Sequence, residues 1–107
     1  MMPPVSNVAD VLERAAALIE PEGSWTQGDN ALDARREPTE PQMSDATCWC
    51  LEGALQRFGG RHLAYQAVRR VIGESNLWGW NDDPQRTQAE VVAALRKAAA
   101  IARGDAS

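Results

Sequence analysis

Four stretches of the chain place apolar residues at every third or fourth position, with polar residues between them. The stretches cover residues 7–19, 46–58, 62–72 and 87–102. This spacing brings the apolar side chains onto one face of a helix, so it predicts four amphipathic helices. Ser6 or Asn7 can cap the first helix, and Ser44 or Asp45 can cap the second, because short polar side chains accept from unpaired backbone N–H groups.

Local signals mark where these helices start, stop and pack. Thr87-Gln88-Ala89-Glu90 is a capping-box pattern, which predicts a helix start. Gly59-Gly60 is a tight break and predicts an antiparallel hairpin between the second and third helices. Gly53 lies inside the second helix, where it costs about 1 kcal/mol of helix propensity relative to Ala. We therefore expect Gly53 to mark a close approach, where another backbone or a Trp ring needs room.

The connection between the first and second helices is long and rich in Pro, Gly and acidic residues. It covers residues 21–44, and loops longer than about 12–15 residues in a compact domain are usually functional or disordered. Trp25 is expected to anchor this loop to the body of the protein. Residues 30–36 are predicted to form one or two helical turns, and residues 37–42, with two prolines, an extended segment. Trp49 falls off the apolar stripe of its helix, so the loop must cover it or leave it exposed as a contact.

These elements predict an all-α fold: a compact bundle of four main helices with a long structured loop between helices one and two. The length of 107 residues fits one domain spanning 1–107. Residues 1–5 and 104–107 are expected to be frayed.

The segment Leu77-Trp78-Gly79-Trp80-Asn81-Asp82-Asp83-Pro84, called here the Trp-Asn-Asp segment, stands between two helical patterns. One interpretation is structural: it forms the entry to the last helix, and Trp78 and Trp80 fill the core. The other is functional: it forms a pocket with aromatic walls and a polar end made by Asn81, Asp82 and Arg86. The residues themselves leave both interpretations open.

Composition and charge narrow the classes of function. The net charge of −4 and the pI of about 4.9 argue against a general nucleic-acid binder, which normally has a basic excess. No apolar run approaches the ~20 residues of a membrane span. Residues 1–20 have an amphipathic pattern instead of the apolar run of a signal peptide. Cys48 and Cys50 are two positions apart on a predicted helix, where their side chains point in different directions, so an internal disulfide is not expected, which fits a reducing compartment. We expect a cytoplasmic protein.

The cysteines allow one enzymatic alternative. A free cysteine is usually a small buried hydrophobe. However, Cys50 near a helix N-terminus, with Asp82 or His62 as a base, could serve as the nucleophile of a small hydrolase or transferase. A zinc site made by Cys48, Cys50 and His62 would lack a fourth ligand of the usual kind. We expect no metal and no cofactor.

A basic face between residues 57 and 70 gives a second alternative. It consists of Arg57, Arg61, His62, Arg69 and Arg70. Such a face can meet phosphate groups, so weak nucleic-acid or phosphate binding through it remains open. The acidic loop at residues 20–45 can instead fold over this face, and that interpretation is favoured.

Three short motifs resemble one family. They are Trp25-Thr26-Gln27-Gly28, Trp49-Cys50-Leu51-Glu52-Gly53-Ala54 and Trp80-Asn81-Asp82, the last followed by Arg86-Thr87 and Glu90-Val91. Together they resemble a family of small bacterial and phage proteins, common in actinobacteria and classed as a domain of unknown function. The resemblance spans residues 8–102. It implies a stand-alone cytoplasmic protein, points to Cys50 and not Cys48, and implies that the three motifs meet in the fold. It assigns no activity.

The favoured prediction is a small binding or interaction protein and not an enzyme. Trp is a common anchor in recognition sites, and these motifs place Trp beside polar groups where packing alone would use Leu or Val. The predicted partner is a protein or a small polar ligand, nucleic acid and membrane are disfavoured, and a homodimer is compatible with the sequence. The predicted binding residues are Trp25, Gln27, Trp49, Trp80, Asn81, Asp82 and Arg86.

Overall fold

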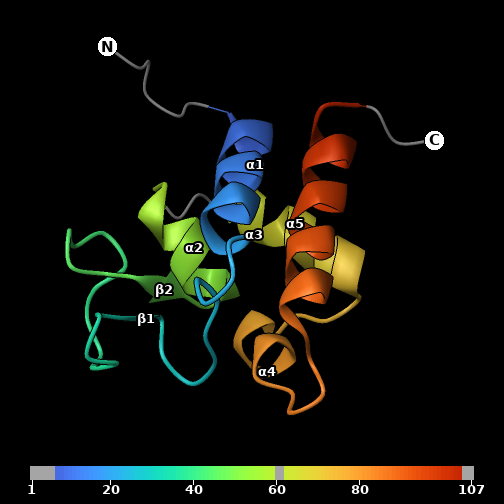
Figure 1. The fold of residues 1–107 in the computed structure, drawn as a ribbon. Coiled ribbons are helices and arrows are strands. Elements are labelled where there is room, and N and C mark those ends of the chain that lie inside the picture. The colour runs from blue at the N-terminus through green and yellow to red at the C-terminus, as the bar shows by residue number, and fades with distance from the viewer. Residues whose placement is uncertain (1–6, 60–61, 105–107) are drawn as a thin grey trace.

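The computed structural model describes residues 7–59 and 62–104, which form five helices and a small two-stranded sheet (Figure 1). The elements in chain order are α1 (Val8–Ile19), β1 (Ala31–Leu32), β2 (Cys48–Trp49), α2 (Leu51–Arg57), α3 (His62–Ile72), α4 (Leu77–Asn81) and α5 (Gln88–Ala102). Helices α1 and α5 lie side by side and run in opposite directions, and α4 lies near the start of α5. The two strands and the long loop lie on the α2 side of the helices.

Three of the four predicted helices are confirmed, together with the predicted caps of α1 and α5. The Asn7 side chain accepts from the backbone N–H of Asp10 at the start of α1. At the start of α5, the side chains of Thr87 and Glu90 each accept from the other's backbone N–H, which completes the capping box. These starts were predictable because a cap depends on residues only two or three positions apart.

The predicted start of the second helix is wrong. Residues 46–50 are not helical, and Cys48–Trp49 instead pairs antiparallel with Ala31–Leu32. The N-cap of α2 is Cys50 and not Ser44 or Asp45. The backbone groups of this segment bond to the long loop, so tertiary pairing replaces the helical hydrogen bonds that the apolar spacing favoured.

Two further expectations need correction. Residues 30–36 contain β1 followed by a turn, not helical turns. The Trp-Asn-Asp segment begins with a fifth helix, α4, which Asn76 caps by accepting from the Gly79 N–H. The fold is therefore mostly helical, which supports the predicted all-α class in its main part, and within the described residues it adds a fifth helix and a small antiparallel sheet to the four predicted helices.

The core forms where α1, α2, α3 and α5 meet, and Ala31, Trp49 and Leu77 join it from the other elements. Trp25 and Trp80 are partly buried and pack against this core. Trp78 is 54% exposed, so the interpretation of Trp78 as a core residue is wrong. The frayed ends predicted for 1–5 and 104–107 fall outside the described residues, except for Gly104.

Gly53 lies where the long loop contacts α2. A Cβ atom built on Gly53 would overlap the carbonyl oxygen of Asn30 and stand 2.8 Å from its carbonyl carbon. The same oxygen accepts from the backbone N–H of Cys50 at 3.2 Å. The predicted close approach at Gly53 is confirmed, and the neighbour is a backbone and not a Trp ring.

Within the ranges that the structure describes, no helix is both long and apolar enough to cross a membrane.

Candidate functional site

Asn81, at the end of α4, joins the three Trp-containing segments through its fully buried side chain. Its Oδ1 accepts from Trp25 Nε1 at 2.7 Å and from the backbone N–H of Leu51 at 3.0 Å. Its Nδ2 donates to the carbonyl oxygen of Thr26 at 3.2 Å and to Asp82 Oδ1 at 2.9 Å. These four bonds use the full capacity of a carboxamide, so no polar atom of Asn81 remains for a ligand.

The bond to Leu51 has a structural consequence for α2. Leu51 is the first residue of that helix, and its N–H has no partner within the helix. Asn81 supplies the missing acceptor from 30 positions along the chain. In the same first turn, the N–H of Gly53 has an acceptor close by in the chain, because it donates to Cys50 Sγ at 3.2 Å.

Backbone pairing brings the Trp25 segment to the same place. The N–H of Thr26 donates to the carbonyl of Trp49 at 3.0 Å, and the N–H of Trp49 donates to the carbonyl of Ser24 at 2.9 Å. Trp25 and Trp49 thus form a parallel bridge on the edge of β2 that β1 leaves open. The three motifs therefore meet in the fold.

Gln27 and Asp82 close the outside of this junction. Gln27 Nε2 donates to the carbonyl oxygens of Asn81 and Asp83, at 2.9 and 2.8 Å. Asp82 Oδ1 accepts from the backbone N–H of Gly28 at 3.0 Å as well as from Asn81. Both predicted site residues thus hold the loop against the end of α4.

Trp49 also holds the loop. Its side chain is buried, and its indole Nε1 donates to the carbonyl of Pro41 at 2.9 Å. Arg57 places its guanidinium 5.5 Å from the centre of the Trp49 ring and donates to the carbonyls of Pro41 and Met43, each at 3.0 Å. Of the two alternatives left open for Trp49, the structure therefore shows the covered one, and Arg57 takes part in this contact.

Trp80 and Arg86 lie on the outer side of the junction and form an aromatic–cation pair. The guanidinium carbon of Arg86 stands 3.9 Å from the centre of the Trp80 ring, and Arg86 Nε donates to the Trp80 carbonyl at 2.9 Å. Arg86 also pairs with Glu90 at 3.6 Å. The two side chains form part of the wall of an open pocket of about 210 Å³, which is lined by Glu74, Asn76, Gly79, Trp80, Asp83 and Arg86.

Sequence reasoning missed two features of this surface. Trp78 is exposed on α4, and no local pattern distinguishes it from Trp80 in a five-residue helix. Asn76 was also missed, although a helix-capping Asn just before Leu77 is a recognisable signal. Gly79 leaves room for this cap, because a Cβ there would stand 2.7 Å from Nδ2 at the end of the Asn76 side chain.

The environment of Cys50 does not activate its thiol. The side chain is fully buried, accepts from Gly53, and donates to Asn30 Oδ1 at 3.6 Å. Burial raises the pKa of the Cys50 thiol from 9.0 to about 11, and the hydrogen bonds from backbone N–H groups offset this rise only in part. At pH 8, about one molecule in a thousand would carry the thiolate. Cys48 is likewise buried, in β2.

Neither proposed base is seen to activate this thiol. The negative charge of Asp82 adds to the rise of the Cys50 pKa, and the Asp82 Oδ1 atom accepts from Gly28 and Asn81. His62 is exposed at the start of α3. In the described part of the chain, no three His, Cys, Asp or Glu side chains gather as metal ligands would. The chemistry that the junction itself offers is hydrogen bonding between its own segments.

The face predicted to be basic is partly used within the fold. Arg57 bonds the loop, and Arg69 donates to the carbonyl of Ser75 at 2.9 Å and lies 5.9 Å from the Tyr65 ring. Arg61 lies outside the described residues. The loop therefore does cover part of this face, through carbonyl groups and not through its acids.

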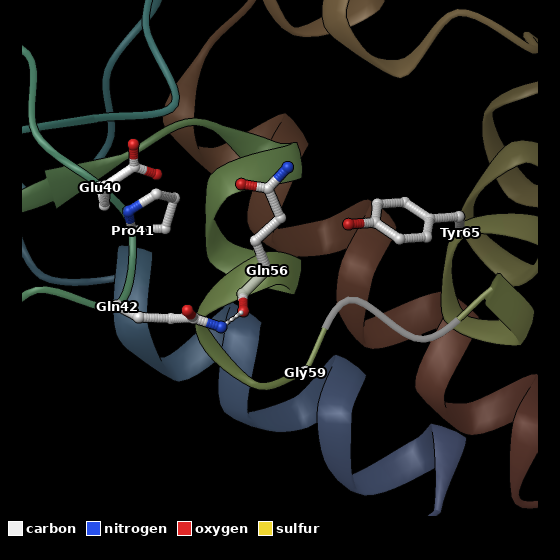
Figure 2. Close-up of a pocket in the computed structure, with 6 residues that line it drawn as sticks. All are labelled: Glu40, Pro41, Gln42, Gln56, Gly59 and Tyr65. Carbon is white, nitrogen blue, oxygen red and sulfur yellow. Dashed lines mark hydrogen bonds between the residues drawn. The ribbon is translucent and has the colours of Figure 1, made fainter.

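A second pocket opens beside the loop and was not predicted. It has a volume of about 290 Å³ and is lined by Glu40, Pro41, Gln42, Gln56, Gly59 and Tyr65 (Figure 2). Gln42 Nε2 donates to the Gln56 carbonyl at 2.9 Å, and the Tyr65 hydroxyl points toward Gln56. Burial, and to a lesser degree the charge of Glu52, raises the pKa of Tyr65. The pocket presents the carboxylate of Glu40 beside neutral polar groups, and none of its lining residues belongs to the three motifs.

The fold and site describe a small helical protein in which two short strands and a loop are tied to a Trp-Asn-Asp turn. The chain belongs to a family whose model, described as "Family of unknown function (DUF6197)", matches residues 3–101. No curated protein and no solved structure matches the chain.

Proposed function

We propose that this protein is a small, non-enzymatic binding protein of the cytoplasm, whose contact surface is the outer side of α4. The observation that carries the proposal is the Trp80–Arg86 pair, which stands 3.9 Å apart on the wall of an open pocket. Trp and Arg are the residue types most enriched among the residues that dominate binding energy at interfaces. Trp78 does not line this pocket, but it is exposed on the same helix and adds apolar area to the surface of α4.

The predicted binding residues divide into two groups by their contacts. The first group bonds the loop, α2 and α4 to one another, and it consists of Trp25, Gln27, Trp49, Asn81 and Asp82. Trp80 and Arg86 face the pocket. The first group favours the structural interpretation of the Trp-Asn-Asp segment, and the second favours the functional one. We assign the first group to positioning α4 and only the second to contact with a partner.

The size of the pocket favours a protein partner over a small ligand. Sites for drug-sized molecules have volumes of roughly 300–1,000 Å³. The pocket beside Trp80 has about 210 Å³, which suits one inserted side chain. Its wall carries two carboxylates, from Glu74 and Asp83, and one guanidinium, from Arg86. Because the carboxylates would repel an anion, the inserted group is a neutral or weakly charged side chain and not a strongly anionic one.

Peptide selection followed by variant binding tests this proposal. Peptides selected from a random displayed library against the wild-type protein are measured against Trp78→Ser, Arg86→Lys and Met43→Ser. Arg86→Lys keeps the charge but loses the flat guanidinium that stacks on Trp80. We expect the selected peptides to bind Trp78→Ser and Arg86→Lys at least about tenfold more weakly, which corresponds to one lost anchor contact.

Met43→Ser is the matched control, because Met43 is 51% exposed and lies in the loop, away from the pocket beside Trp80. Its binding should equal that of the wild type. Peptides that bind Trp78→Ser and Arg86→Lys as tightly as the wild type would refute the proposal. Circular dichroism of each variant confirms that the fold is retained.

A further inference from the structure

An apolar groove runs between α3 and the C-terminal half of α5, on a surface that shares no residue with the pocket beside Trp80. It has a volume of about 540 Å³ and is lined by Val8, Leu63, Gln66, Ala67, Arg70, Val71, Lys97, Ile101 and Ala102. Leu63 is 60% exposed and Ile101 is 41% exposed. Two large apolar side chains thus face solvent from opposite walls of one groove, an arrangement that marks interaction sites.

Among the residues that the structure describes, the charges on this groove are of one sign. Arg70 and Lys97 are the charged residues of its described lining, which contains no acidic residue. Within residues 7–59 and 62–104, neither cation takes part in a hydrogen bond or an ion pair, whereas Arg86 and Arg96 each have a carboxylate partner. Unpaired cations beside an apolar surface are complementary to an acidic and apolar partner.

The shape of the groove suits a helix. Leu63, Ala67 and Val71 follow one another at every fourth position of α3, so they span about two helical turns, or roughly 12 Å. On the other wall, Lys97 and Ile101 are also four positions apart. An amphipathic helix that lays its apolar face into a groove makes contacts with this periodicity.

A second copy of the chain fits this groove poorly. In a two-fold symmetric dimer the same patch meets itself. Because the charged residues of this patch are both cations, Arg70 and Lys97 of one copy would approach those of the other. Like charges placed together oppose such an interface.

We propose that this groove binds an acidic amphipathic helix of a partner protein. Apolar side chains of that helix lie against Leu63 and Ile101, and its carboxylates pair with Arg70 and Lys97. The inference concerns a separate surface from the one proposed above, so either can fail without the other.

Binding of a model helix tests the inference. The probe is a fluorescein-labelled peptide of about 16 residues, with Leu at helical positions i, i+3, i+4 and i+7 and Glu at the flanking positions. Fluorescence anisotropy measures its affinity for the wild type and for variants. We expect Leu63→Ser and Ile101→Ser each to weaken binding about tenfold or more, because each removes a large apolar contact. Arg70→Glu and Lys97→Glu should weaken it similarly, and added salt should weaken wild-type binding.

Matched controls distinguish binding at this groove from nonspecific binding. Met43→Ser removes another exposed apolar side chain, which does not line this groove, and should bind the probe as the wild type does. A peptide with Lys in place of every Glu, and a scrambled peptide of the same composition, should each bind at least about tenfold more weakly.

Four results would overturn the inference. The first is no binding of the acidic probe up to about millimolar protein, the weak end of the affinity scale. The second is equal binding of the acidic probe and its Lys-containing counterpart. The third is a dimer in sedimentation that Leu63→Ser dissociates, which would assign the groove to a second copy. The fourth is retention on anionic vesicles that Leu63→Ser abolishes, which would assign the groove to a membrane surface.

Discussion

Replacing Asn81 with Ala tests whether its side chain holds the fold together. The change removes the acceptor for the buried N–H of Leu51 and the donor for the carbonyl of Thr26, a residue that is itself almost fully buried. A buried polar group left without its partner costs about 1–3 kcal/mol. Trp25 is only partly buried, so water can replace its lost partner at little cost.

We therefore expect Asn81→Ala to lower the free energy of unfolding by roughly 3–5 kcal/mol, a large share of the 5–15 kcal/mol typical of small domains. Urea unfolding, followed by far-ultraviolet circular dichroism and by Trp fluorescence, measures this change. Gln85→Ala is the matched control, because Gln85 is an exposed amide four positions away whose side chain makes no hydrogen bond within the described residues. It should change stability by less than about 0.5 kcal/mol.

Asn81→Asp separates the effect of hydrogen bonding from that of side-chain size. Asp is as large as Asn and keeps the oxygen that accepts from Trp25 and Leu51, but an oxygen replaces the nitrogen that donates to Thr26 and Asp82. We expect Asn81→Asp to be less stable than the wild type at neutral pH. The difference should lessen as the pH is lowered through the range in which carboxyl groups take up protons, down to about pH 4. If Asn81→Ala and Asn81→Asp both stayed within about 1 kcal/mol of the wild type, the central role given to Asn81 would be wrong.

The remaining predictions concern Gly53 and Cys50. Gly53→Ala should lower stability by about 1–3 kcal/mol despite the better helix propensity of Ala, because the new methyl meets the backbone of Asn30. The control Gly79→Ala should cost less, because its methyl meets only a side chain. Thermal unfolding measures both, and a Gly53→Ala variant more stable than the wild type would contradict the close approach. Cys50 should react with iodoacetamide at pH 8 only when the protein is unfolded, since burial raises its pKa to about 11. Because the folded-state pKa is the higher one, the resulting stability is intact below pH 9 and declines by roughly 1–3 kcal/mol as the pH rises from about 9 to 11. Cys50→Ser should lack this part of the alkaline decline, and an equal decline in both proteins would contradict it.

Some features of the candidate site could be predicted from the sequence, and others could not. The need for space at Gly53 follows from a residue that is out of place in an amphipathic helix, and so does the question of what covers Trp49, which the sequence left open between the loop and a contact surface. The different roles of Asn81 and Arg86 do not follow from the sequence. Both are polar residues beside Trp80, and only the contacts distinguish an amide with four internal bonds from a guanidinium on a pocket wall.

The sequence by itself determined α1, α3 and α5, because apolar periodicity and caps act over a few positions of the chain. Only the tertiary structure decided the form of residues 46–50. Their helical spacing is overridden because Cys48–Trp49 pairs with β1 on one edge and with the Trp25 segment on the other. Hydrogen bonds between residues distant in the chain leave no local pattern. The sequence showed that the Trp-Asn-Asp segment is unusual. Because hydrogen bonds between distant residues leave no local pattern, only the fold distinguished Asn81, which is buried and bonds three segments, from the surface proposed for binding.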